Sequence, residues 1–101
     1  MWEALGLRRE IVSEVIPASW TAPTPIQQRA IPPAVAGRDI IGLAETGAGK
    51  TGAFALPIID GLLGAPSKLH ALVLAPTREL ASQLHDDIRA LGAPIGALPG
   101  L

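Results

Sequence analysis

A glycine-rich turn between an apolar run and a helical pattern constrains this chain more than any other feature. Residues 39–44 form a short apolar run of the length expected for a buried strand. After the turn, residues 50–63 are apolar enough for a helix that packs on a sheet, although Pro57 should kink it or shift its start. A strand that turns directly into a helix is a building unit of α/β domains, so the sequence predicts an α/β fold.

The turn itself has the composition of a phosphate-binding loop. Gly47 and Gly49 permit backbone angles that a side chain would block, so that successive N–H groups can converge on phosphate oxygens at the helix start. Lys50 would neutralise the β- and γ-phosphates, and the Thr51 hydroxyl would coordinate Mg²⁺. The alternative is a plain strand-to-helix turn with an incidental lysine. The predicted nucleotide-binding residues are Ala44, Glu45, Thr46, Gly47, Ala48, Gly49, Lys50 and Thr51.

The remaining pattern places further elements around this unit. Apolar residues recur at helical spacing over residues 5–16, and a helix start at Thr24 leads to a stop at Gly37, with Pro32 and Pro33 expected to bend that helix. Residues 70–75 are a second apolar run of strand length, and residues 77–91 have the pattern of an amphipathic helix. The predicted order is helix, helix, strand, helix, strand, helix, with the two strands parallel.

An indole and an amide stand beside the second helix start. Thr24, Pro25 and Gln27 occupy the N-cap, N1 and N3 positions of a capping box. Trp20 and Gln27 could instead supply a stacking face and a bidentate amide contact to adenine. From the spacing, both interpretations stay open.

Composition sets limits on partners. The 101 residues carry a formal net charge of −1, so any nucleic-acid binding must come from a local site rather than from bulk charge. There is no cysteine, and no apolar run approaches the ~20 residues of a membrane span. We expect an intracellular protein that does not associate with membranes.

Three segments together resemble the DEAD-box RNA helicases. Residues 19–27, Ser-Trp-Thr-Ala-Pro-Thr-Pro-Ile-Gln, resemble the Q motif of that family. Residues 44–51 resemble its motif I, and residues 76–81 resemble its motif Ia. Trp2 stands 17 positions before Ser19, where the family has an isolated aromatic residue. The motifs occur in the family order over about residues 1–92, which makes them more specific together than singly.

The resemblance implies a partial RecA-like P-loop NTPase domain that binds ATP and Mg²⁺. By resemblance, Gln27 reads adenine, Trp20 packs on the base, and Lys50 and Thr51 act on the phosphates and the metal. The implied RNA contacts are Pro76, Thr77, Arg78 and Glu79. The chain would then divide into a Q-motif region (1–28), an ATP-binding part (29–92) and an irregular Gly/Pro/Ala tail (93–101).

The sequence also departs from the family pattern. It contains no Asp-Glu-Ala-Asp and no Ser-Ala-Thr segment, so we expect a truncated domain that binds ATP without hydrolysing it. The parent activity implied is ATP-dependent RNA remodelling. The alternatives are a non-hydrolysing nucleotide- or RNA-binding module and a non-functional remnant. Residues 37–44 and 52–58 look most like helicases of nuclear pre-ribosomal RNA processing, which implies a nuclear or nucleolar location.

Overall fold

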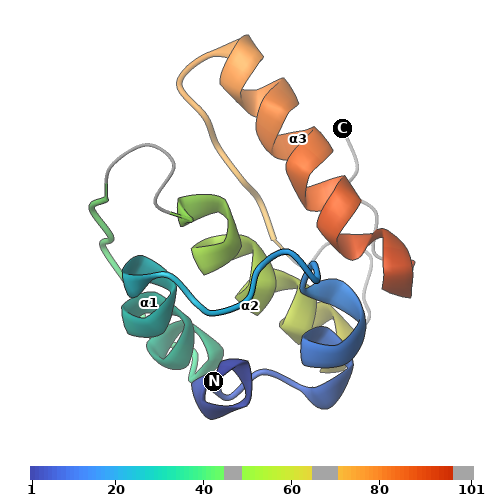
Figure 1. Ribbon diagram of the computed structural model, residues 1–101. Helices are drawn as coiled ribbons and strands as arrows, with labels where there is room; N and C mark the ends of the chain where they lie inside the picture. Colours follow the sequence, from blue (N-terminus) through green and yellow to red (C-terminus); the bar gives the residue numbers. More distant parts are fainter. Residues whose placement is uncertain (45–48, 65–70, 97–101) are drawn as a thin grey trace.

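The computed structural model describes residues 1–44, 49–64 and 71–96. Its three α-helices are α1 (Pro25–Val35), α2 (Lys50–Gly64) and α3 (Arg78–Gly92). Three short helical turns accompany them: the 3-10 helix η1 (Trp2–Leu5), the π-helix η2 (Ile11–Val15) and the 3-10 helix η3 (Ala93–Ile95). Figure 1 shows α2 between α1 and α3, and α2 contacts both.

The capping box of α1 is confirmed. The Thr24 hydroxyl accepts a hydrogen bond from the Gln27 backbone N–H, and the Gln27 side chain accepts one from the Thr24 backbone N–H. Pro25 opens the helix at N1, where its missing N–H costs no intrahelical bond. The helix continues through Pro32 and Pro33 to Val35, and Gly37 then takes a left-handed φ of 83°. The predicted helix and its stop are therefore present.

The predicted single helix over residues 5–16 is not formed. Gly6 adopts a φ of 90°, which an L-residue rarely takes, and it separates η1 from η2. The apolar side chains of this stretch are nevertheless buried as their spacing suggested, with Leu7, Ile11 and Val15 in the core. The predicted helix was therefore wrong in its backbone path, because a left-handed glycine interrupts it. The apolar residues that were expected to face inward still do so.

Helix α2 provides the centre of the core. It spans Lys50–Gly64 with Pro57 inside it, close to the predicted range. Ile11, Ile31, Leu56 and Ile59 are the largest fully buried side chains, and they bring η2, α1 and α2 together. Full burial of such a side chain contributes on the order of 1.5–3 kcal/mol relative to exposure. The core therefore joins the start of the chain to the helix that follows the glycine-rich turn.

A buried carboxylate ties the start of the chain to the end of α2. The Arg8 backbone N–H donates to Asp60 Oδ1 at 2.7 Å, and Arg8 Nε donates to the Asp60 carbonyl oxygen at 3.2 Å. Asp60 is buried, whereas the Arg8 side chain is about half exposed. The contact thus satisfies a polar group that α2 carries into the core.

The two apolar runs predicted as parallel strands are extended but unpaired. None of residues 1–44, 49–64 or 71–96 belongs to a strand, so the predicted sheet is not confirmed. Ile41 and Leu43 are 94% and 90% exposed, and Leu72 and Leu74 are 79% and 83% exposed. Figure 1 shows one run leaving the end of α1 and the other leading into α3. A strand completes its backbone hydrogen bonds only with a neighbouring strand, and neither run has one among the described residues.

The end of the described chain differs slightly from the expectation. Helix α3 begins after Thr77, whose hydroxyl accepts from the Leu80 backbone N–H at 3.1 Å, and it ends at Gly92, as its pattern predicts. The tail predicted to be irregular begins instead with η3, which Pro94 favours by presetting a helical φ.

Candidate functional site

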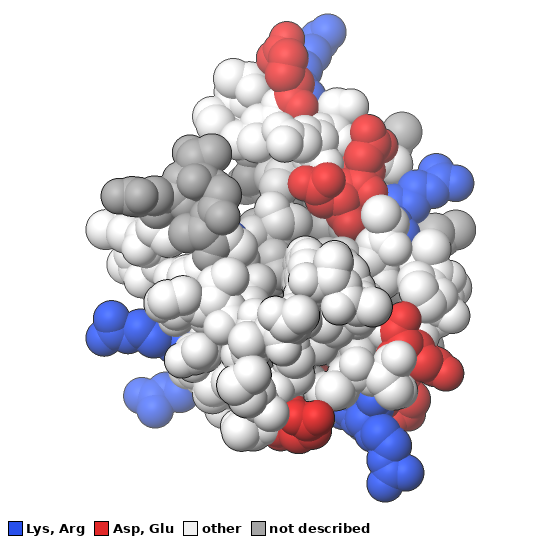
Figure 2. All heavy atoms as spheres, viewed as in Figure 1, with Lys and Arg blue, Asp and Glu red and all other residues white. Residues whose placement is uncertain are grey.

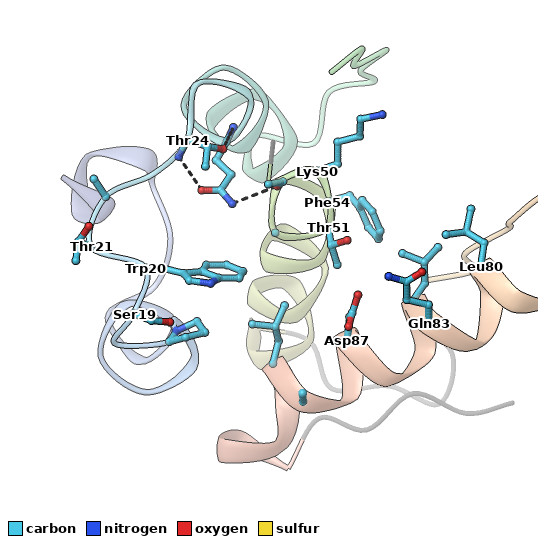
Figure 3. Close-up of a pocket in the computed structure, with 18 residues that line it drawn as sticks. Ser19, Trp20, Thr21, Thr24, Lys50, Thr51, Phe54, Leu80, Gln83 and Asp87 are labelled. Carbon is cyan, nitrogen blue, oxygen red and sulfur yellow. Dashed lines mark hydrogen bonds between the residues drawn. The ribbon is translucent and has the colours of Figure 1, made fainter. Parts of the chain in front are cut away.

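A cleft of about 1080 Å³ lies between the loop before α1, the start of α2 and one face of α3 (Figure 3). The loop contributes Ser19, Trp20 and Thr21, and α2 contributes Lys50, Thr51 and Phe54. Several of the residues predicted to bind nucleotide therefore meet at one opening. Its volume lies slightly above the ~300–1,000 Å³ typical of small-molecule sites.

Gln27 links the loop before α1 to the glycine-rich turn. It is only 2% exposed. Its Oε1 accepts from the Thr24 backbone N–H at 2.9 Å, and its Nε2 donates to the Gly49 carbonyl at 3.2 Å. The structural role considered from the sequence is confirmed. An amide has two N–H groups and two lone pairs, so one of each is left over, and the adenine contact stays a prediction.

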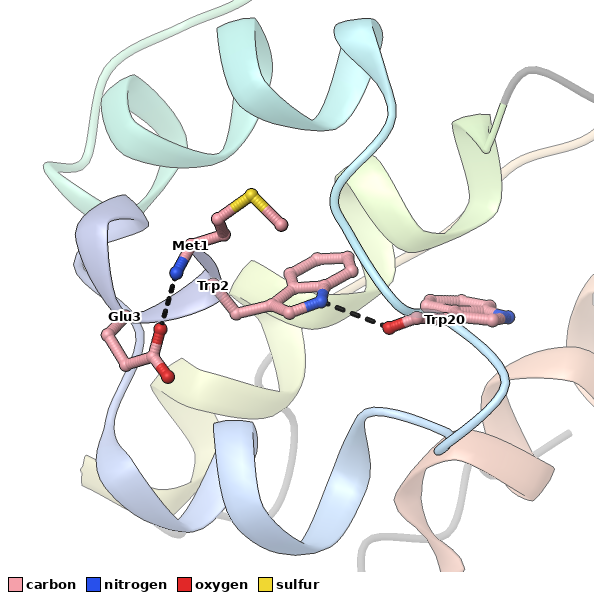
Figure 4. Close-up of polar contacts among 4 residues, drawn as sticks. All are labelled: Met1, Trp2, Glu3 and Trp20. Atoms are coloured by element: carbon pink, nitrogen blue, oxygen red, sulfur yellow. Dashed lines mark hydrogen bonds and ion pairs between the residues drawn. The ribbon is translucent and has the colours of Figure 1, made fainter.

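Trp20 lies at the cleft and is held from behind by Trp2. The two rings are stacked, with centroids 6.3 Å apart and planes 26° from parallel. The Trp2 indole N–H donates to the Trp20 carbonyl oxygen at 3.2 Å, as Figure 4 shows. Trp2 is buried in the core, while Trp20 is partly buried and lines the cleft. The two aromatic residues singled out from the sequence are thus brought together.

The described end of the glycine-rich turn, which the sequence predicts to bind phosphate, requires a glycine at its last position. Gly49 takes a φ of 87°, so a glycine is required there. Lys50, which is exposed, and Thr51, which is half-buried, are the first residues of α2 and line the cleft. Glu45, Thr46, Gly47 and Ala48 lie outside the described residues. The positive end of the α2 dipole is therefore directed to the side where the loop would hold phosphate.

The residues predicted to contact RNA lie at the start of α3. Pro76, Thr77, Arg78 and Glu79 are all exposed. Thr77 is the N-cap of α3, so the first N–H groups of the helix and the Arg78 guanidinium belong to the same short segment. These four residues do not line the cleft of Figure 3, whose nearest contribution from α3 is Leu80.

Charge is spread over the surface rather than concentrated. In Figure 2 the lysine and arginine side chains stand at the rim of the visible face, while acidic side chains lie both at the rim and just above its middle. Near the start of the chain, the amino terminus donates to Glu3 Oε2 at 2.8 Å, a hydrogen bond that lowers the pKa of that exposed carboxyl. Broad electrostatic attraction of a polyanion is not a feature of this face.

One wall of the cleft was not predicted. Leu80, Gln83, Leu84, Asp87, Ala90 and Leu91 line it from α3. Figure 3 shows Gln83 and Asp87 on the side of α3 that faces α2. Their spacing of three and four residues indicates one helical face, but only tertiary packing turns that face toward α2. Gly52, which also lines the cleft, was missed as well.

The described residues offer neither a cluster of metal ligands nor a helix that could span a membrane. No group of three or more His, Cys, Asp or Glu side chains within residues 1–44, 49–64 and 71–96 is placed to hold a metal ion. Across the same ranges, every helix is too short or too polar to cross a bilayer.

Comparison with known proteins identifies the class. The DEAD/DEAH box helicase family matches residues 24–99, which is most of the chain. This chain belongs to the DEAD/DEAH box helicase family. The match includes the capping box of α1, the phosphate loop and the start of α3, and it confirms the resemblance drawn from the three motifs.

Individual relatives are similar over a small part of their length. Probable ATP-dependent RNA helicase DDX47 of Homo sapiens is 66% identical over 77 residues, which are 76% of this chain and 17% of the relative. ATP-dependent RNA helicase DDX47 of Drosophila melanogaster is 54% identical over 95 residues, 94% of this chain and 19% of the relative. ATP-dependent rRNA helicase rrp3 of Aspergillus terreus is 60% identical over 76 residues, 75% of this chain and 17% of the relative. The chain thus spans less than a fifth of these relatives, and the predicted likeness to rRNA helicases is confirmed.

A solved structure supports the fold. The RNA helicase Prp28 of Chaetomium thermophilum, crystallised with ADP, superposes with a TM-score of 0.83 and 41% sequence identity. The superposition covers 96% of this chain and 25% of that one. The arrangement of helices described above is therefore that of part of a helicase domain, consistent with a partial RecA-like fold.

Proposed function

We propose that this chain binds ATP in the cleft of Figure 3, as the nucleotide-binding part of an ATP-dependent RNA helicase. The observation that carries the proposal is the start of α2: Lys50 and Thr51 follow a left-handed Gly49 and open into the cleft that holds Trp20. The base packs against Trp20 and meets the remaining polar groups of Gln27. The polyphosphate extends to Lys50 and to the loop residues 44–49.

Magnesium fits this site as a partner of the phosphates. Mg²⁺ binds through one or two protein oxygens and completes its shell with water and phosphate oxygens. The Thr51 hydroxyl lies at the cleft and supplies one such oxygen. When bound, the ion neutralises charge on the polyphosphate, while Lys50 acts as a point charge beside it.

The start of α3 is the proposed RNA contact. The exposed N-terminal N–H groups of α3 and the Arg78 side chain form a local anion site that needs no net positive charge. Pro76, Thr77 and Glu79 complete the segment. Contacts of this kind bind the phosphate backbone and carry little sequence information, as RNA remodelling of varied substrates requires.

The wider function follows the relatives. We propose that the parent activity is ATP-dependent remodelling of ribosomal RNA precursors in the nucleus or nucleolus. The 101 residues contain no Asp-Glu-Ala-Asp segment, so on their own they bind ATP without turning it over.

Calorimetric titration with Mg·ATP tests the phosphate site. Lys50→Ala removes a charged hydrogen-bond donor and should weaken binding about 10- to 100-fold. Arg38→Ala removes an exposed cation away from the cleft and should leave affinity unchanged. ATP should bind more tightly than GTP. Equal affinity of Lys50→Ala and the parent chain would refute the proposed phosphate site.

A further inference from the structure

The first turn of α2 has a glycine that its backbone does not require. Gly52 is the third residue of the helix, and glycine costs about 1 kcal/mol relative to alanine in a helix interior. Unlike Gly49, Gly52 does not take a positive φ. Local conformation therefore gives no reason for a glycine at this position.

The space around Gly52 gives the reason. A Cβ atom built on it would lie 2.9 Å from Trp20 Cζ3, 3.2 Å from Trp20 Cη2 and 2.6 Å from Gln27 Nε2. The distances to Gln27 Nε2 and Trp20 Cζ3 are shorter than a real Cβ atom tolerates, and the distance to Trp20 Cη2 is tighter than most Cβ contacts. The six-membered ring of the Trp20 indole and the Gln27 amide both rest on the bare backbone of α2.

Both neighbours are held in place by other contacts. Trp20 is stacked on Trp2, and its carbonyl accepts the Trp2 indole N–H at 3.2 Å. Gln27 is buried, and both ends of its amide are hydrogen-bonded. A methyl group at position 52 must therefore turn the Trp20 ring, displace the Gln27 amide or push α2 away.

We infer that Gly52 is a positioning residue that seats the Trp20 indole, and with it the base of a bound purine nucleotide. This inference rests on the proposed ATP site. Because Gly52 acts on the side of Trp20 and Gln27, its effect is expected to be larger on the base than on the phosphates at Lys50. The bare backbone at position 52 and the large ring at position 20 act as a matched pair.

Comparing the affinities for two ligands distinguishes an effect on the base from an effect on the phosphates. With Gly52→Ala, affinity for Mg·ATP should fall about 5- to 150-fold, the range that loss of one base–aromatic stack produces. Affinity for inorganic tripolyphosphate, which has no base, should fall by a clearly smaller factor, because only the Gln27–Gly49 hydrogen bond connects the new methyl group to the phosphate side. Equal losses for both ligands would show that the substitution disturbs the whole loop, and the inference would be wrong.

A second substitution tests the steric cause. Trp20→Phe removes the outer ring atoms that the new methyl group meets, so Gly52→Ala should cost less ATP affinity in the Trp20→Phe background than in the parent chain. An equal loss of ATP affinity in both backgrounds would contradict the proposal that Gly52 makes room for the Trp20 ring. Gly42→Ala is the control, because among the described residues its Cβ would meet Ile26 Cδ1 alone, at an ordinary 3.6 Å.

The two proposals fail differently. If the parent chain binds neither ATP nor tripolyphosphate, the proposed function fails and the inference fails with it. If the parent chain binds ATP and Gly52→Ala binds it equally well, only the positioning role of Gly52 is lost. Circular dichroism spectra of all variants verify that they retain the helical content of the parent chain.

Discussion

The packed region from η1 to α2 and the two extended runs, residues 39–44 and 71–75, are both apolar in sequence but opposite in structure. In the packed region Ile11, Ile31 and Leu56 have no measurable exposure. In the extended runs Ile41, Leu43, Leu72 and Leu74 are almost fully exposed. Apolar composition by itself therefore did not decide burial in this chain.

The difference comes from where each backbone finds its hydrogen bonds. A helix satisfies its central N–H and C=O groups within itself and needs only one packed face. A strand in a parallel sheet needs neighbours on both edges and covering layers on both faces. The helices can thus assemble from contacts among themselves. The two apolar runs have no strand to pair with among the described residues.

The largest expected effect on stability tests whether the packed region is buried and the extended runs are exposed. Leu56→Ala should lower the free energy of unfolding by about 2–5 kcal/mol, because it removes a fully buried side chain and leaves a cavity. Leu72→Ala, the same change in an exposed run, should alter it by no more than about 0.5 kcal/mol. Urea denaturation followed by tryptophan fluorescence measures both. A comparable loss for Leu72→Ala would mean that this run is packed after all.

A smaller effect is expected from the buried carboxylate of the packed region. Asp60→Ala leaves the Arg8 N–H without its acceptor and should cost about 1–3 kcal/mol of unfolding free energy. Asp86→Ala is the matched control, since that carboxylate is 76% exposed. Thermal unfolding at neutral pH compares the two. An unchanged midpoint for Asp60→Ala would show that the contact does not hold the start of the chain to α2.

The smallest effect concerns the helix start beside the cleft. Thr24→Ala removes the N-cap of α1 and should cost about 1 kcal/mol. Thr21→Ala, in the same loop but exposed, should be neutral. Urea titration of both variants, with helix content read by circular dichroism, provides the comparison. If Thr24→Ala unfolds at the same urea concentration as the parent chain, packing and not capping sets the start of α1.

Much of the helical structure could be read from the sequence. The capping box at Thr24 and the glycine after α1 are local signals for the two ends of α1, and the hydroxyl cap at Thr77 is one for the start of α3. The helix predicted over residues 5–16 was wrong because the helical spacing of apolar residues does not reveal a left-handed Gly6. The strands could not be predicted reliably because their partners are distant in sequence.

The candidate site was predicted in part. Trp20, Gln27, Lys50 and Thr51 were identified by motif, and they do line one cleft. Gln83 and Asp87 were not identified, because a polar helical face has the same sequence pattern whether it borders open solvent or a cleft. Gly52 was not identified either, because the side chains that lie against it, Gln27 and Trp20, are 25 and 32 positions earlier in the chain.

The sequence by itself determined the family and the ends of α1 and α3, which depend on signals within a few positions, and it predicted which residues would meet phosphate. Only the tertiary structure decided that Trp2 stacks behind Trp20, that Gln27 is hydrogen-bonded to Gly49 and that α3 closes the cleft. These contacts depend on close packing between segments far apart in the chain, where differences of a few tenths of an ångström decide which side chain fits.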